Sequence, residues 1–180
     1  GDTIVLTRLE HHSNIVPWQI LATEKGFAIE VIELNEDGTL NEESLQEKLA
    51  MKPKLVALSH VSNTLGTVND VKRITALAKS FGAIVLIDGS QALPHKKVDV
   101  RDIGCDFYAG SGHKMYGPSG VGFLYGRHEI LESMPPWRGG GEMIETVTFE
   151  ETTTFNIPPY KFEAGTPHLS GVIGLGAALD

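Results

Sequence analysis

The sequence predicts an α/β fold, with a mainly parallel central sheet and helices on both of its faces. Strand-like and helix-like segments alternate along most of the 180 residues, with short connections between them. This alternation is the signature of an open α/β sheet. The strand-like segments are mostly apolar, as expected for strands that are buried on both faces of a parallel sheet. The length suits a single domain.

The strand-like segments are rich in β-branched and apolar residues, and one of them alternates apolar with polar positions. Residues 83–88 (AIVLID) have the strongest strand character. The predicted strands comprise residues 3–9, 27–34, 54–61, 83–88, 105–111 and 120–126.

Helical patterns lie between these strands. Ser13 is expected to be the N-cap of the first helix, which Gly26 ends. Asn41 caps the second helix, whose acidic first turn suits the helix dipole. Asp70 or Asn69 caps the third. The predicted helices comprise residues 14–26, 41–50, 71–82 and a segment that begins near Ser170.

The pattern loosens after Arg127. Residues 135–144 and 152–167 are rich in Gly, Pro and Thr. They are expected to form loops and short extended pieces.

The composition excludes several classes of protein. The formal net charge is −8 and the sequence pI is about 5.3, which argues against nucleic-acid binding, because phosphates require a basic face. No apolar run reaches the length of a membrane span. Cys105 is the only cysteine, so an internal disulfide is impossible and a reducing, cytoplasmic location is expected.

Polar side chains follow four of the predicted strands at the points where the strands end. In open α/β sheets, ligands bind in the crevice at the carboxyl ends of the strands. We therefore expect a ligand site at that edge of the sheet. The polar residues at the strand ends are His11, His12, His60, Ser62, Asn63, Asp88, Ser90, Gln91, Ser111, His113 and Lys114.

Lys114 stands in an unusual segment, GSGHKMYGP, among glycines and hydrogen-bonding side chains. It could be a solvated loop lysine. Alternatively, Gly112 gives room for close approach, and a lysine in a tight, partly dry site becomes an amine nucleophile. Asp88, at the end of an apolar strand, could cap a turn or hold a cation such as a protonated ring nitrogen. A Schiff-base lysine together with an aspartate is what proteins supply to pyridoxal-phosphate chemistry.

Other chemistries fit the sequence less well. The phosphate-loop pattern needs glycine before the lysine, where His113 stands, and the dinucleotide pattern needs glycine in place of Met115. The seven histidines lack metal-site spacing, so no metal is expected. Cys105 could be a nucleophile, but a buried small hydrophobe is the more common role, and nothing cationic nearby in the sequence would lower its pKa.

Six motifs in order resemble the group II cysteine desulfurases and the related selenocysteine lyases. They are EHHSNIVPW, HVSNTLGT, VLIDGSQ, CDFYAGSGHKMYGPSGVGFLY, RGGGEMI and FEAGTP. These enzymes belong to the class V aminotransferase family of fold-type I pyridoxal-phosphate enzymes. The resemblance implies that Lys114 forms the Schiff base with pyridoxal 5′-phosphate and that Asp88 pairs with the pyridine nitrogen. It also implies that His11 stacks on the ring and helps in proton transfer.

The resemblance implies roles for five further residues. Gln91 would contact the phenolic oxygen, and Asn63 would lie near that oxygen and the substrate carboxylate. Ser111 and His113 would hold the phosphate. Thr166 resembles a position that reaches the phosphate of a partner subunit, which implies a homodimer.

The implied activity is removal of sulfur from L-cysteine, which leaves L-alanine and an enzyme persulfide for an acceptor protein in iron–sulfur cluster assembly. Residues 1–180 would form the central part of the large domain, without the preceding segment and the C-terminal small domain. The sulfur-accepting cysteine and the arginine for the substrate carboxylate belong to the family's later segments, so the isolated chain is expected to be inactive. Alternatives are a selenocysteine lyase, another class V enzyme, or a non-catalytic module that keeps the fold.

Overall fold

The computed structural model describes residues 1–180 and contains a six-stranded sheet with the order β2-β1-β3-β4-β5-β6. Strands β1 to β5 pair in parallel, and β6 runs antiparallel to β5. This arrangement confirms the predicted mainly parallel α/β fold. The strands are β1 (Thr3–Thr7), β2 (Ala28–Ile32), β3 (Leu55–Ser59), β4 (Ile84–Asp88), β5 (Phe107–Ser111) and β6 (Gly122–Gly126).

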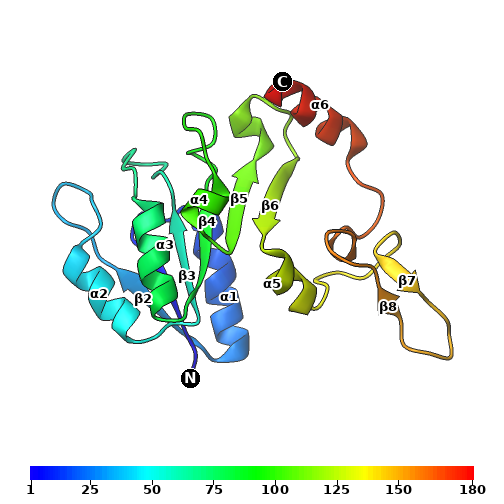
Figure 1. Cartoon of the computed structure of the whole chain (residues 1–180), viewed down its shortest axis with the longest axis horizontal. Coiled ribbons are helices and arrows are strands. Elements are labelled where there is room, and N and C mark those ends of the chain that lie inside the picture. The colour runs from blue at the N-terminus through cyan, green and yellow to red at the C-terminus, as the bar shows by residue number, and fades with distance from the viewer.

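Helices cover both faces of this sheet (Figure 1). The α-helices are α1 (Val16–Lys25), α2 (Glu42–Ala50), α3 (Val71–Ser80), α4 (Val100–Ile103), α5 (His128–Ser133) and α6 (Leu169–Leu179). Three short 3₁₀ turns are η1 (His12–Asn14), η2 (Gly112–Met115) and η3 (Tyr160–Phe162). A separate hairpin of β7 (Ile144–Thr146) and β8 (Thr154–Phe155) lies away from the main sheet (Figure 1).

Alternate side chains of the strands enter two separate apolar clusters, because successive residues of a strand point to opposite faces. Val5 of β1 packs in the larger cluster, which also takes its members from α2 and α3. Ile4 and Leu6 pack in a smaller cluster with Ala57 of β3 and Trp18 of α1. The sheet is therefore buried on both faces, as its apolar strands predict.

The helix caps agree with the sequence at two of three sites. The Asn41 side chain accepts from the backbone N–H of Ser44 at 2.8 Å, and Asp70 accepts from that of Arg73 at 3.0 Å. Ser13 was wrongly expected to cap the first helix. The chain instead makes η1 first, and α1 begins only at Val16, without a side-chain cap. The short helices α4 and α5 were not expected, since each is too short to show a helical period.

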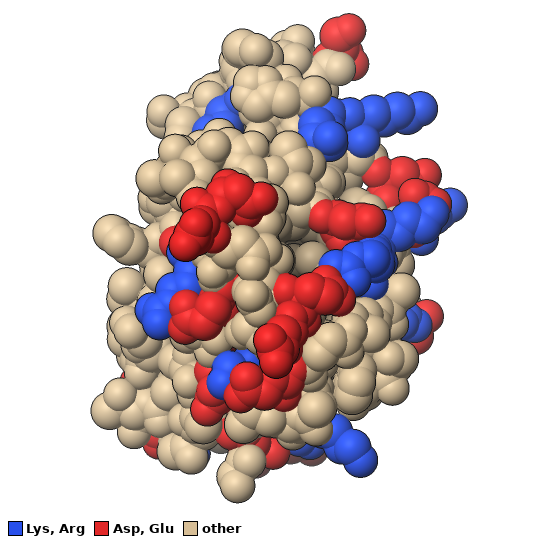
Figure 2. Space-filling model, turned by 90° about the vertical axis from the view of Figure 1, so that its left-hand side faces the viewer, with Lys and Arg blue, Asp and Glu red and all other residues tan.

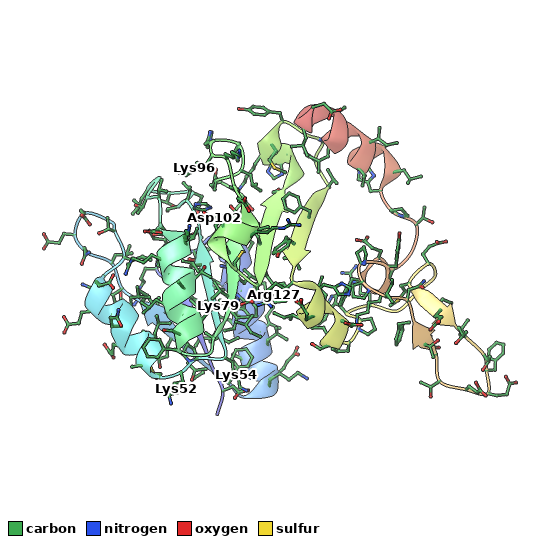
Figure 3. The ribbon with its side chains drawn as sticks, in the orientation of Figure 1. Lys52, Lys54, Lys79, Lys96, Asp102 and Arg127 are labelled. Carbon is green, nitrogen blue, oxygen red and sulfur yellow. The ribbon has the colours of Figure 1, made fainter.

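A buried carboxylate joins three elements on the face of the sheet that α3 covers. Asp106 accepts from Lys79 of α3 at 2.7 Å, from the backbone N–H of Val85 in β4 at 2.9 Å, and from Arg127 after β6 at 3.4 Å. Figure 3 labels Lys79 and Arg127, which lie near each other because both bond the same oxygen of Asp106. The Asp106 side chain is only 4% exposed, so its charge depends on these partners.

Gly89 and Tyr108 fix the contact between the end of β4 and β5. The Tyr108 side chain is fully buried. A Cβ atom at position 89 would lie 1.9 Å from its Cε1 atom, so only glycine fits there. The backbone N–H of Gly89 also donates to the carbonyl of Ala109 at 2.9 Å. This close approach sets how the chain leaves β4, directly after Asp88.

Replacing Gly89 with alanine should destabilise the protein by at least ~2 kcal/mol, because the new methyl group must displace a fully buried ring. The free energy of unfolding from urea titration measures the effect. Gly176→Ala is the matched control. It lies in α6 with no atom within 4 Å of its added Cβ, and it should leave stability unchanged or raise it. Equal stability of the two variants would contradict this packing account.

Candidate active site

The carboxyl ends of β3, β4 and β5 lie in register at one edge of the sheet. Ser59 pairs with Asp88, and Asp88 pairs with Ala109. The ladder continues past the strands, since the backbone N–H of His60 donates to the carbonyl of Asp88 at 2.9 Å. The segments that follow β1, β3, β4 and β5 therefore leave the sheet at the same edge. This edge is where the sequence predicts the site.

Lys114 lies in η2, which directly follows β5. Its side chain is half-buried and takes part in no ion pair or hydrogen bond within the chain. Gly112 allows the tight turn, because a Cβ there would lie 2.7 Å from the carbonyl oxygen of Val121. The Ser111 hydroxyl and His113 Nδ1 are 2.9 Å apart and face a common side of the turn. The amine of Lys114 is thus available for a ligand.

Asp88 divides its two carboxylate oxygens between two roles. Oδ1 accepts from the backbone N–H of Ser90 at 2.9 Å, as in an ordinary turn. Oδ2 has no hydrogen-bond partner in the chain. The turn interpretation of this residue is therefore confirmed, and the second carboxylate oxygen is left available to accept from a ligand.

His11 is exposed in the segment between β1 and η1. Its Nδ1 accepts from the backbone N–H of Ser13 at 3.2 Å and lies 2.9 Å from the Ser13 hydroxyl. Because a backbone N–H can only donate, the proton of the neutral ring belongs on Nε2. The ring therefore offers an N–H group on the side away from its own turn.

The other predicted site residues have less defined surroundings. Gln91 is half-buried after β4, and Asn63 is exposed after β3. Neither side chain has a hydrogen-bond partner in the chain. Thr166 is exposed in the segment that joins η3 to α6, and it does not follow a strand. The sheet edge thus gathers all the predicted residues except Thr166.

Sequence reasoning missed Glu10, which precedes His11 and is only 7% exposed. Its carboxylate accepts from Thr7, Asn14 and Ser59 at 2.5 to 2.9 Å. Burial raises its pKa, although these hydrogen bonds oppose the shift. The one available signal was a charged residue directly after a buried strand, where an unpartnered charge would be costly.

His60 and Tyr108 form a second buried polar pair at this edge, with His60 Nδ1 2.9 Å from the Tyr108 hydroxyl. Burial raises the pKa of the Tyr108 phenol, so the phenol keeps its proton. Burial, with a further contribution from Lys96, lowers the pKa of His60. His60 lines a hollow of about 480 Å³ together with Lys96 and Asp102, which Figure 3 labels.

Charged side chains elsewhere do not suggest a second site. Figure 2 shows many acidic side chains on the side of the molecule that lies at the left of Figure 1, where α2 is. Exposed carboxylates of the chain are paired with basic side chains, such as Glu33 with Arg8 at 2.8 Å and Glu42 with Arg73 at 2.7 Å. No group of three or more potential metal ligands comes together, and no helix is long and apolar enough to cross a bilayer.

Cys105 lies in the core, with 1% of its surface exposed. Burial raises the pKa of its thiol to about 11, so the thiolate that a nucleophile requires is scarce near neutral pH. The structure therefore favours the small-hydrophobe interpretation of this residue.

The chain belongs to the aminotransferase class-V family, whose sequence model matches residues 1–180. It is 55% identical over 180 residues to a cysteine desulfurase from Serratia proteamaculans (strain 568), and it spans 44% of that protein's length. It also resembles the crystal structure of the cysteine desulfurase CsdA from Escherichia coli. That match has a TM-score of 0.95 and 43% identity, and it covers 99% of this chain and 45% of the other.

A third match is a variant of C-DES that was solved with glycine covalently linked to its PLP cofactor. The TM-score is 0.89 with 30% identity, over 99% of this chain and 48% of that one. The chain thus spans less than half the length of the relatives that it matches. Their shared fold confirms the fold-type I architecture that the motifs implied.

The stability of the fold should depend on pH through His60. The pKa of His60 is lower in the folded state than its ordinary value of 6.5, so the unfolded state binds more protons as the pH falls. The stability that neutral His60 contributes is complete above about pH 6.5 and is lost as the pH falls through the folded pKa. His60→Gln should flatten this part of the curve of unfolding free energy against pH.

His128→Gln provides the control, because His128 is 64% exposed. It should keep the slope of the parent protein. A slope that persists in His60→Gln would show that other groups cause the pH dependence.

Proposed function

We propose that the protein containing this chain is a pyridoxal-phosphate-dependent cysteine desulfurase, which converts L-cysteine to L-alanine and leaves a persulfide on the enzyme. The observation that supports this proposal most directly is a pair of groups without partners at the carboxyl edge of the sheet. Lys114 is half-buried without an anion, and Asp88 Oδ2 has no donor. The similarity to cysteine desulfurases over the whole chain supports the choice of reaction.

The groups at the sheet edge fit the proposed cofactor. A primary amine that carries no partner can hold an aldehyde covalently. A half-buried carboxylate oxygen that lacks a donor can accept from a protonated ring nitrogen and stabilise its charge. The Ser111 hydroxyl and the His113 ring, 2.9 Å apart, can bind phosphate oxygens. The set contains the chemical groups that pyridoxal phosphate requires, and Gln91 and Asn63 add amide groups at the same edge.

Three residues of the chain would act in the reaction. When bound, pyridoxal phosphate supplies an electron sink that stabilises negative charge at the substrate α-carbon. Asp88 would keep the ring nitrogen protonated. Lys114 would hold the cofactor and, once displaced by the substrate amine, would carry a proton on Nζ. His11 would lie against the ring with its Nε2–H directed away from Ser13, where it can take part in proton transfer.

The wider assignment includes parts of the protein outside residues 1–180. In this proposal these residues form the central part of the large domain, and other segments supply the sulfur-accepting cysteine and the arginine for the substrate carboxylate. An acceptor protein would take the sulfur for iron–sulfur cluster assembly.

A cytoplasmic location is part of the proposal, because Cys105 is a free thiol and reducing compartments preserve free thiols. A selenocysteine lyase is the alternative, since the visible groups would bind the cofactor and not the substrate side chain.

A homodimer is also part of the proposal. Thr166 would reach the cofactor phosphate of the partner subunit. Large apolar side chains around the β7–β8 hairpin are exposed, and Phe149 and Trp137 are 106% and 79% exposed. Large apolar side chains exposed in one region of the chain are available for burial in an interface. A second copy would cover these side chains and bring Thr166 to a site.

The protein that contains this chain should release L-alanine from L-cysteine when pyridoxal phosphate is present. Lys114→Ala should lower the rate by at least about 10³-fold, because a covalent role cannot be replaced by another side chain. The assay is quantification of alanine and sulfide.

Lys97→Ala is the matched control, because Lys97 is an exposed lysine outside the proposed set, and it should keep the parent rate. Alanine production by Lys114→Ala at the parent rate would exclude the proposed role of Lys114. A protein that releases alanine only from L-selenocysteine would favour the selenocysteine lyase.

A further inference from the structure

Glu10 is a buried carboxylate that the proposed reaction does not use. It stands directly before His11, and only 7% of its surface is exposed to solvent. Placing a carboxylate in such a site is costly unless hydrogen bonds offset the desolvation. The arrangement of its partners indicates what this residue does.

The hydrogen bonds of Glu10 connect three elements. Oε1 accepts from the Thr7 hydroxyl at the end of β1 at 2.5 Å and from the backbone N–H of Ser59 at the end of β3 at 2.9 Å. Oε2 accepts from Asn14 Nδ2 in η1 at 2.7 Å. Asn14 Oδ1 in turn accepts from Trp18 Nε1 of α1 at 3.0 Å. The ends of β1 and β3, the η1 turn and, through Asn14, helix α1 are thus joined through one carboxylate.

His11 has no comparable anchor of its own. Its ring is exposed and bonds only to Ser13, within the same turn. The carboxylate of Glu10 is the side-chain link between this turn and β3. Ser59 is also the register partner of Asp88, so the link ends beside the proposed site.

We propose that Glu10 is a positioning residue for His11, holding the His11 turn against the ends of β1 and β3 so that the ring faces Asp88 and Lys114. The proposal rests on the function proposed above for His11. One charged side chain, Asp88, affects the Glu10 carboxylate. Its negative charge contributes to raising the Glu10 pKa. The other groups facing Glu10, from β1, η1 and β3, are the uncharged Thr7, Asn14 and Ser59.

Glu10→Gln tests this role with little change of shape. The groups that contact the carboxylate all donate hydrogen bonds to it. An amide nitrogen in place of either oxygen would therefore face another N–H group. In place of Oε1 it faces the backbone N–H of Ser59, which cannot turn. In place of Oε2 it faces the Asn14 amide, which cannot flip without losing its bond from Trp18. Glu10→Gln should therefore release the turn that carries His11.

The direct readout is the ¹⁵N spectrum of the His11 ring in the protein without cofactor, recorded at about pH 8. The parent protein should show a proton on Nε2 and none on Nδ1. Glu10→Gln should show the averaged signals of two tautomers. The kcat for alanine release should also fall by roughly 10-fold to 100-fold, as expected when a reacting group is misplaced by about 1 Å.

Two further variants sharpen the test. In Glu10→Gln combined with Asn14→Asp, the new amide nitrogen at position 10 can donate to the new carboxylate at position 14. This double variant should recover both the single tautomer and most of kcat. Glu36→Gln is the control, because Glu36 is exposed and has no side-chain partner, and it should match the parent. If Glu10→Gln fails to fold, Asn14→Ala removes the link from Glu10 to η1, together with the bond from Trp18, and should shift the ring signals in the same direction.

Unchanged His11 signals in Glu10→Gln, or in Asn14→Ala where the first variant does not fold, would overturn the positioning role. A double variant that folds but leaves the two tautomers averaged would overturn it as well. The ring measurement needs neither cofactor nor substrate. Failure of the parent protein to release alanine would therefore count against the proposed function and leave the role of Glu10 separately testable.

Discussion

The parallel register of β3, β4 and β5 is the constraint on which the rest of the structure depends. It places Ser59, Asp88 and Ala109 side by side, and hydrogen bonds from the first residues beyond β3 and β4 extend the ladder past the strands. Because parallel strands end at one edge, segments far apart in the sequence deliver their side chains to a common place. A one-residue slip would turn Asp88 to the opposite face of the sheet.

Tight packing and buried hydrogen bonds maintain this edge. Gly89 lets the Tyr108 ring lie against the end of β4, and Tyr108 in turn bonds His60. On the other side of β3, Glu10 ties the β1 end to Ser59. The partnered polar groups make the edge rigid, while Lys114 and one oxygen of Asp88 are left unpaired. A rigid frame around unpaired groups is what binding a polar cofactor requires, because the site loses little freedom when the ligand arrives.

The fold and the position of most candidate site residues at the sheet edge could be predicted because they follow from local patterns. Apolar runs gave the six strands of the main sheet, and polar residues at their ends indicated the site. Ser13 was assigned wrongly because a cap signal does not show whether the first turn is 3₁₀ or α. Glu10 escaped notice because its partners Ser59 and Asn14 become neighbours only in the folded chain. Thr166 follows no strand, so the strand-end pattern that locates the other candidate residues does not apply to it.

The most direct test of the central claim is chemical. Borohydride reduction of the cofactor-loaded protein that contains this chain, followed by digestion and mass analysis of the peptides, locates the lysine that holds the cofactor. The account predicts a single pyridoxyl group on Lys114, in the peptide that contains GSGHKMYGP. A pyridoxyl group on another lysine, or on none, would contradict the assignment of the carboxyl edge of the sheet as the cofactor site.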